Sequence, residues 1–159
     1  MKKFALIAAT CLVLAFVSAQ DLSAQAVDIS WNIGVITSKD FKFDPFLWME
    51  GLTYDFYLTR RLSLSPEIFT TVHNLDFRNT ILSPAILLNY QGSGFFFGGG
   101  ATKWWYLGST VEGALPTDVL CKLNVGLVVR GLKLTVFVVT PFNAFFNTMW
   151  VGATLGYYY

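Results

Sequence analysis

One stretch constrains the fold of this chain more than any other part. The sequence from Val119 to Thr140, VLCKLNVGLVVRGLKLTVFVVT, consists of two alternating runs joined by Arg130-Gly131. This pattern predicts a β-hairpin with a two-residue turn. The turn sets the cross-strand pairs, which are aliphatic on one face: Val129 with Leu132, Leu127 with Leu134, Val125 with Val136, and Leu123 with Val138.

The opposite face of this hairpin mixes polar, small and apolar side chains. Its expected pairs are Val128 with Lys133, Gly126 with Thr135, Asn124 with Phe137, and Lys122 with Val139. Alternation with a period of two also occurs in water-soluble sheets, so the hairpin alone does not establish what each face contacts.

The N-terminal residues 1-19 have the organisation of a secretory signal peptide. A cationic start is followed by an apolar run from Phe4 to Val17 and by a small residue at Ala19. Cleavage is expected after Ala19, with a position as late as residue 26 as the alternative. The run is shorter than the ~20 residues of a membrane-spanning helix, and Cys11 lies inside it. Both features disfavour a membrane anchor and a lipid-modified cysteine.

Residues 27-159 are expected to form one mature domain. Cys121 is the single cysteine in this region, so no disulfide can form within it. The net charge of the whole chain is +1 and its charges are scattered, which argues against a nucleic-acid partner. No uninterrupted apolar run of ~18 residues follows the leader, so a helical membrane protein is not expected. The chain is nevertheless 54% hydrophobic and 17% aromatic, which is high for a water-soluble domain.

Alternating segments occur throughout residues 27-159. Eight strands are predicted, at residues 27-37, 46-58, 62-72, 81-90, 95-107, 119-129, 132-140 and 149-159. The second, fourth and sixth connections are tight polar turns, whereas the others are longer. With an even number of strands, the tight turns and both termini are therefore expected at one end. Bulky ring residues at that end of the apolar face predict an interfacial aromatic girdle: Tyr54, Phe56, Tyr90 and Phe96.

The register of segment 95-107 is ambiguous from the sequence. If Lys103 avoids the apolar outer face, then Phe96, Trp104 and Tyr106 lie on that face. The glycine triplet Gly98-Gly99-Gly100 is expected to form a bend or a β-bulge.

Pro66 and Pro84 fall in the middle of predicted strands. Proline has no N–H to donate, so each residue removes one hydrogen bond from the sheet. We therefore expect a local bulge or a shifted register in segments 62-72 and 81-90.

The two faces of the predicted sheet indicate a membrane protein. Large apolar side chains occur on the face that water would contact in a soluble sheet: Tyr57, Phe69, Leu87, Phe137, Val139 and Trp150. The other face is nearly free of charge over strands of about 9 to 11 residues, the length that crosses a bilayer when tilted. Lipid offers no hydrogen bonds to an open edge, so the sheet must close. The predicted fold is all-β, an eight-stranded antiparallel up-and-down transmembrane β-barrel with a lumen only wide enough for side chains. A soluble lipocalin-like barrel is the alternative.

The mature region resembles the small eight-stranded outer-membrane β-barrels of the OmpA, OmpX and OmpW type. Its most specific part is the last strand, VGATLGYYY, in which alternate apolar residues end in an aromatic residue. In that family such a strand is recognised by the barrel-assembly machinery, and its last residue is usually Phe rather than Tyr. The resemblance implies an assembly signal formed by Val151, Ala153, Leu155, Tyr157 and Tyr159. It also implies a porin-like monomer, exported by the Sec route to the outer membrane of a Gram-negative cell envelope, where its partners are lipid and lipopolysaccharide.

Five charged residues are expected to face the barrel interior: Asp55, Glu67, Lys103, Lys122 and Lys133. One interpretation is a network of ion pairs that fills the lumen, because charges in a narrow interior are costly unless they are paired or hydrated. The other is a charged constriction that selects small solutes. The expected function is therefore a structural or interaction barrel with a plugged lumen or, alternatively, a narrow outer-membrane pore for small or hydrophobic solutes.

A surface lipid-modifying enzyme is a more distant alternative. His73 and Asp76 share a connection expected outside the cell, but acyl transfer also needs a serine within reach. Ser83 lies well inside the next strand and Ser109 in another connection, so no catalytic residue is assigned and no enzyme is expected. No cysteine or histidine cluster suggests a metal, and the glycine triplet lacks the Lys-Ser/Thr of a phosphate-binding loop. No cofactor or metal is therefore expected.

Overall fold

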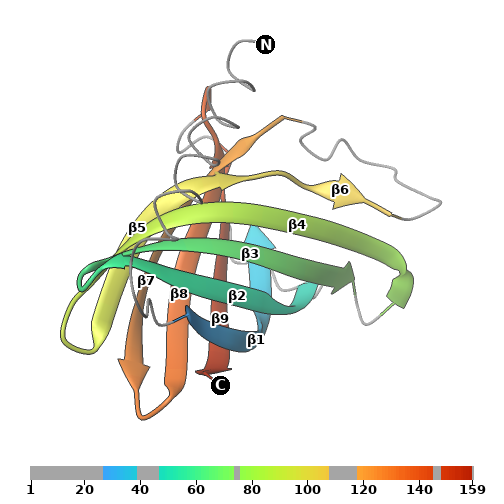
Figure 1. Cartoon of the computed structure of the whole chain (residues 1–159). Coiled ribbons are helices and arrows are strands. Elements are labelled where there is room, and N and C mark those ends of the chain that lie inside the picture. The colour runs from blue at the N-terminus through green and yellow to red at the C-terminus, as the bar shows by residue number, and fades with distance from the viewer. Residues whose placement is uncertain (1–26, 39–46, 74–75, 108–117, 145–147, 159) are drawn as a thin grey trace.

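The fold is that of a computed structural model, which describes residues 27–38, 47–73, 76–107, 118–144 and 148–158. Nearly all of these residues lie in β-strands (Figure 1). Within these ranges, no helix has the length and apolarity needed to cross a membrane. The expected signal peptide, including its alternative end at residue 26, lies outside the described residues.

The strands are antiparallel to their neighbours. Their bounds are β1 (Val27–Ser38), β2 (Leu47–Thr59), β3 (Leu62–His73), β4 (Asp76–Gln91), β5 (Phe95–Thr102), β6 (Trp105–Tyr106), β7 (Leu120–Val129), β8 (Leu132–Pro141) and β9 (Trp150–Tyr158). Strands β5 and β6 are two parts of one wall. Thr102 pairs with Ala85 and Trp105 pairs with Leu82, so the register is the same on both sides of the gap.

These strands form a closed sheet of eight walls. Paired neighbours follow the order β3-β2-β1-β9-β8-β7-β5-β4, and an additional pairing joins β4 back to β3. The first strand, β1, pairs directly with the last, β9. Closure gives each wall a hydrogen-bonded neighbour on both sides, and the prediction of a closed, eight-stranded antiparallel barrel is confirmed.

The three tight turns lie at one end of the barrel, which we call the tight-turn end; the opposite end is the loop end. Backbone hydrogen bonds connect neighbouring turns and strand ends there: Gln91 N to Arg61 O at 2.7 Å, Val128 N to Gly94 O at 2.9 Å, and Tyr158 N to Gly131 O at 2.9 Å. The C-terminal end of β9 is therefore at the tight-turn end as well, close to the β7–β8 turn (Figure 1).

The β7–β8 hairpin agrees with the sequence prediction pair for pair. Arg130 has φ 50° and Gly131 has φ 83°. Two consecutive residues with positive φ are characteristic of the type I′ turn, whose twist matches that of the flanking strands. The expected pairs are all present, from Val129 opposite Leu132 at the turn to Lys122 opposite Val139.

No bulge or shifted register occurs at the prolines themselves; the irregular pairings of β3 lie at its two ends, opposite Tyr57 to Thr59 and at Val72 to His73. Both Pro66 and Pro84 are paired in the β3–β4 ladder without a shift. On the other side of each proline the ladder is interrupted, opposite Tyr54 in β2 and opposite Lys103 after β5, and then resumes in the same register. Each proline thus removes local pairing without displacing the strand, because the neighbouring pairs and the closed sheet hold the register.

The expected register of residues 95–107 is also wrong. Phe96 is 0% exposed and Trp104 is 9% exposed, so both face the interior, whereas Lys103 is exposed. The glycine triplet is not a bulge, because Gly98, Gly99 and Gly100 pair with β4 in sequence. The first and last of these face inward, where a Cβ would lie 2.1 and 1.9 Å from atoms of β4. Only glycine fits at positions 98 and 100 on the inner face. Because side chains alternate along a strand, Lys103 then lies on the outer face, near the loop end.

Candidate functional site

The barrel wall has the opposite polarity to that of a soluble protein. Large apolar side chains are exposed on the outer face of β1, β3, β4, β5, β7, β8 and β9: Ile29, Trp31, Ile68, Ile86, Leu88, Phe97, Leu123, Val125, Leu127, Leu134, Val136 and Leu155. Polar side chains are buried inside: Ser30, Asn32, Thr53, Ser63, Ser65, Asn89, Asn124, Thr135 and Thr154. An apolar exterior around a polar interior is stable where the surrounding solvent is itself apolar.

The interior consists of two layers. Toward the loop end lies an apolar cluster: Ile36, Met49, Phe69, Trp104, Leu120, Phe137 and Val139. Trp104 contacts Trp150 edge to face, with ring centroids 4.7 Å apart. Below this cluster the interior is polar and contains four of the five charged residues expected there: Asp55, Glu67, Lys122 and Lys133.

Asp55 is the centre of the lower polar network. Its Oδ2 accepts a hydrogen bond from Lys133 Nζ at 2.7 Å and one from Tyr158 Oη at 2.9 Å, and Ser65 Oγ donates to Oδ1. The Lys133 ammonium also lies 5.0 Å from the Phe96 ring centroid and 5.3 Å from that of Tyr158. The pair is almost completely buried, at 3% and 0% side-chain exposure. Direct partners on every side are what make a buried charge tolerable.

Glu67 and Lys122 form the second pair. Lys122 Nζ donates to Glu67 Oε2, and Thr53 Oγ1 donates to Oε1 at 3.4 Å. The ammonium lies between two rings, 4.9 Å from the centroid of Phe69 and 4.6 Å from that of Phe137. Both lysines therefore share one arrangement, a carboxylate partner and two flanking aromatic rings, in which cation–π attraction adds to the ion pair.

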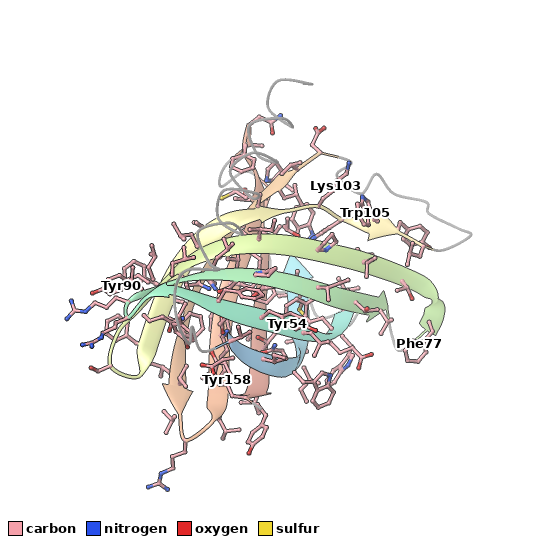
Figure 2. The ribbon with its side chains drawn as sticks, viewed as in Figure 1. Tyr54, Phe77, Tyr90, Lys103, Trp105 and Tyr158 are labelled. Carbon is pink, nitrogen blue, oxygen red and sulfur yellow. The ribbon has the colours of Figure 1, made fainter. Side chains whose placement is uncertain are left out.

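Both ion pairs cross the lumen. Asp55 on β2 reaches Lys133 on β8, and Glu67 on β3 reaches Lys122 on β7; neither pair of strands is adjacent in the sheet. Each ion pair thus joins two walls that are not neighbours, and we call the two pairs crossbars. Lys103 does not belong to this cluster, which corrects the sequence prediction, because the register of its strand points it outward near the loop end (Figure 2).

Three of the four rings beside the lysines occupy space left by glycines on the next strand. Phe69 lies opposite Gly51, Phe96 opposite Gly126, and Phe137 opposite Gly152. A Cβ on these glycines would lie 2.2 to 2.7 Å from atoms of the facing rings. Such pairing of large and small residues fills a narrow barrel completely. Sequence reasoning missed it, although the inward Phe and Gly were visible as alternating residues.

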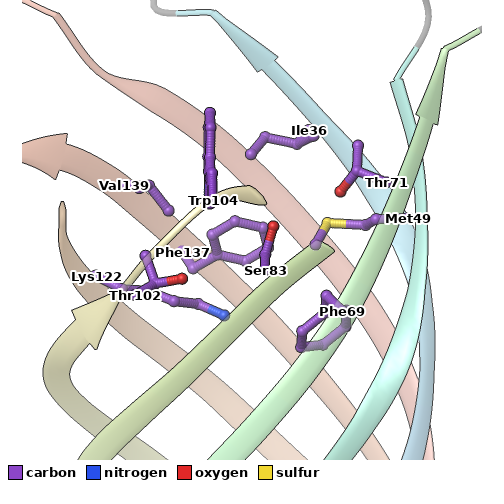
Figure 3. Close-up of a pocket in the computed structure, with 10 residues that line it drawn as sticks. All are labelled: Ile36, Met49, Phe69, Thr71, Ser83, Thr102, Trp104, Lys122, Phe137 and Val139. Atoms are coloured by element: carbon purple, nitrogen blue, oxygen red, sulfur yellow. The ribbon is translucent and has the colours of Figure 1, made fainter. Parts of the chain in front are cut away.

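A cavity of about 20 Å³ lies where the two layers meet, and Lys122, Thr71, Ser83 and Thr102 contribute polar atoms to its wall (Figure 3). This volume holds about one water molecule. A larger cleft of about 320 Å³ opens at the tight-turn end, between Tyr57, Arg60, Gln91 and Tyr158. Tyr158, which lines this cleft, donates to Asp55 of the lower polar network.

One residue of the predicted aromatic girdle, Phe96, does not lie on the outer face. Tyr54, Phe56 and Tyr90 are partly exposed near the tight-turn end, whereas Phe96 is completely buried in the lumen. Phe97, which is 51% exposed, takes its place and contacts Tyr90 with ring centroids 5.3 Å apart. Figure 2 shows Tyr54 and Tyr90 on the barrel wall.

The last strand presents the expected row on its outer face. Leu155 and Tyr157 are exposed, and Val151 and Ala153 are partly exposed. Tyr159 lies outside the described residues.

Of the candidate residues for acyl transfer, the structure describes the side chain of Ser83 alone. Ser83 is 8% exposed and faces the lumen, and the side chains of His73 and Asp76 and all of Ser109 lie outside the described residues. Among the residues that the structure describes, no group of three or more His, Cys, Asp or Glu side chains is placed to hold a metal ion.

Comparisons with known proteins support the fold alone. No family model and no curated protein sequence matches this chain. Among solved structures, a de novo designed transmembrane β-barrel is similar with a TM-score of 0.53 and 13% identity, covering 87% of this chain and 100% of that one. The N-terminal β-barrel domain of Pseudomonas aeruginosa OprF is similar with a TM-score of 0.50 and 10% identity, covering 83% of this chain and 97% of the domain. The chain therefore has the fold of small transmembrane β-barrels.

Proposed function

We propose that this protein is an integral outer-membrane β-barrel that is closed by its own side chains and has a structural or interaction role. The apolar outer wall supports the membrane location, since water would make that surface costly. The observation that carries the closed lumen is the pair of buried crossbars, Asp55–Lys133 and Glu67–Lys122, beside a cavity of only about 20 Å³.

The same proposal covers its biogenesis and partners. The chain is exported through a cleaved leader, and its last strand, ending in Tyr159, is recognised by the barrel-assembly machinery. The folded monomer then contacts outer-membrane lipid and lipopolysaccharide. It needs no cofactor and is not an enzyme; the inward position of Ser83 supports this, because a lumenal serine is out of reach of an external lipid.

Conductance of the inserted protein tests the closed lumen. The mature protein is refolded into vesicles, insertion is verified by heat-dependent gel mobility, and current is recorded across a planar bilayer. We expect no discrete current steps. Reproducible, salt-dependent steps would instead support the alternative function, a narrow pore for small solutes in which Glu67 and Lys122 set selectivity.

A further inference from the structure

The charges of the tight turns are all of one sign. Arg60 and Arg61 lie in the β2–β3 turn and Arg130 lies in the β7–β8 turn, while the β4–β5 turn contains only Gly92, Ser93 and Gly94. The nearest described carboxylates point elsewhere. Asp55 is paired inside the lumen, and Asp28 accepts a hydrogen bond from Tyr57 Oη at 2.8 Å. Among the residues that the structure describes at the tight-turn end, the arginines therefore outnumber the carboxylates that are free of a partner.

At the rim of this end the backbone of Arg61 is held by two hydrogen bonds, and its side chain contacts Tyr90. The backbone N of Arg61 donates to Thr59 Oγ1 at 3.2 Å, and its carbonyl accepts from Gln91 N at 2.7 Å. Its guanidinium Nη1 donates to Tyr90 Oη at 3.3 Å. A guanidinium has five N–H donors, so most of this group remains available to a ligand.

The surroundings of Arg61 combine this cation with an apolar surface. The Tyr90 ring packs on Phe97, which is 51% exposed on the outer wall, and Leu88 on the same wall is 48% exposed. The Tyr90 hydroxyl and the Arg61 guanidinium thus lie at the tight-turn end, next to the exposed apolar side chains of the outer wall. The Arg130 turn repeats the combination, since Gly131 lies against the ring of Tyr157, which is 51% exposed.

We propose that Arg61 and Tyr90 bind the phosphate of an anionic phospholipid headgroup at the tight-turn end, with the acyl chains along Phe97 and Leu88. The inference rests on the proposed membrane-spanning function. A guanidinium group can donate two parallel hydrogen bonds to the oxygens of one phosphate. The phenolic hydroxyl of Tyr90 can donate a further hydrogen bond to the same phosphate. The excess of arginine over carboxylate at the rim favours a lipid with net negative charge over a zwitterionic one.

Native mass spectrometry of the refolded protein with phosphatidylglycerol and phosphatidylcholine tests this site. We expect retained phosphatidylglycerol to exceed phosphatidylcholine, and Arg61→Gln to reduce that preference about fivefold, the effect of one interfacial cation. Tyr90→Phe keeps the ring, so it should weaken binding less. Lys103→Gln, which removes an exposed cation near the loop end, is the matched control and should leave the preference unchanged.

Three results would overturn the proposal. Equal retention by wild type and Arg61→Gln would remove Arg61 as a ligand. An equal loss in Lys103→Gln would indicate unspecific attraction by net charge. Displacement of the lipid by millimolar inorganic phosphate would assign the site to free phosphate. Heat-dependent gel mobility, measured on protein from vesicles, distinguishes failure of the membrane proposal from failure of the headgroup site. Protein that never inserts contradicts the membrane proposal. Inserted protein without a lipid preference contradicts only the headgroup site.

Discussion

The buried lysines show how single residues close this barrel. Each ammonium is neutralised by a carboxylate from a non-adjacent strand and enclosed by two rings. A charge removed from water costs several kcal/mol unless its partners replace the lost hydration. The arrangement therefore depends on both members of each pair.

Removing one member of a pair should be much more harmful than removing both. We expect Glu67→Gln to lower the free energy of unfolding by about 3–5 kcal/mol, because Lys122 would remain buried without its counterion. The double variant Glu67→Gln/Lys122→Met should recover a large part of this loss. Equilibrium denaturant unfolding in lipid vesicles measures both, and equal stabilities of the single and double variants would contradict the crossbar account.

The inward glycines give a second test at the scale of single atoms. Gly100→Ala should destabilise the barrel by about 1–3 kcal/mol, since its Cβ would lie 1.9 Å from the carbonyl oxygen of Ile86. Gly99→Ala is the matched control on the outer face, where the nearest atom belongs to the flexible side chain of Leu123. Comparable losses in the two variants would show that the inner face is not selectively crowded.

For the strands, the residues of the turns predicted the register better than the placement of charged residues did. The β7–β8 hairpin was predictable because Arg130-Gly131 fixes the turn, and the turn fixes every following pair. The orientation of β5 was not, because the prediction kept Lys103 off the outer face and ignored the space that inward glycines provide. Phe96 was consequently assigned to the girdle, although it fills the space opposite Gly126 in the lumen.

The candidate site was predictable only in part. Alternation alone indicated that Asp55, Glu67, Lys122 and Lys133 face inward. Which lysine meets which carboxylate depends on the relative height of non-adjacent strands around the closed sheet, and no local pattern contains that information. The flanking rings were missed for the same reason, because Phe69 and Phe137 come from different walls.

The prolines provide a prediction for whole strands. Pro84→Val should raise the free energy of unfolding by about 0.5–1.5 kcal/mol, because it restores an N–H opposite Lys103, whose own N already donates to the Pro84 carbonyl at 3.1 Å. Pro66→Val should act similarly opposite Tyr54. Denaturant unfolding checks both variants, and a loss of stability in both would mean that the prolines are required where they are.

At the scale of the whole molecule, the inverted polarity of the wall implies an apolar surround. Val136 is 44% exposed in the middle of β8. In vesicles, Val136→Arg should lower the free energy of unfolding by about 2–4 kcal/mol, the cost of a cation within the hydrocarbon layer. Phe142→Arg, at a position 61% exposed beyond β8, serves as the control and should cost far less. A tolerated arginine at residue 136 would indicate that this face meets water.

A spin-label scan along β7, from Leu123 to Val129 in a Cys121→Ala background, tests in vesicles whether the outer face contacts lipid and whether the inner face is filled. Labels at 123, 125, 127 and 129 should be accessible to oxygen, which partitions into lipid. A label at 124, which faces the interior, should be immobilised and inaccessible to a water-soluble nickel complex. Access of the nickel complex to position 124 would contradict a filled lumen, and its access to positions 123, 125 and 127 would contradict a membrane-spanning barrel.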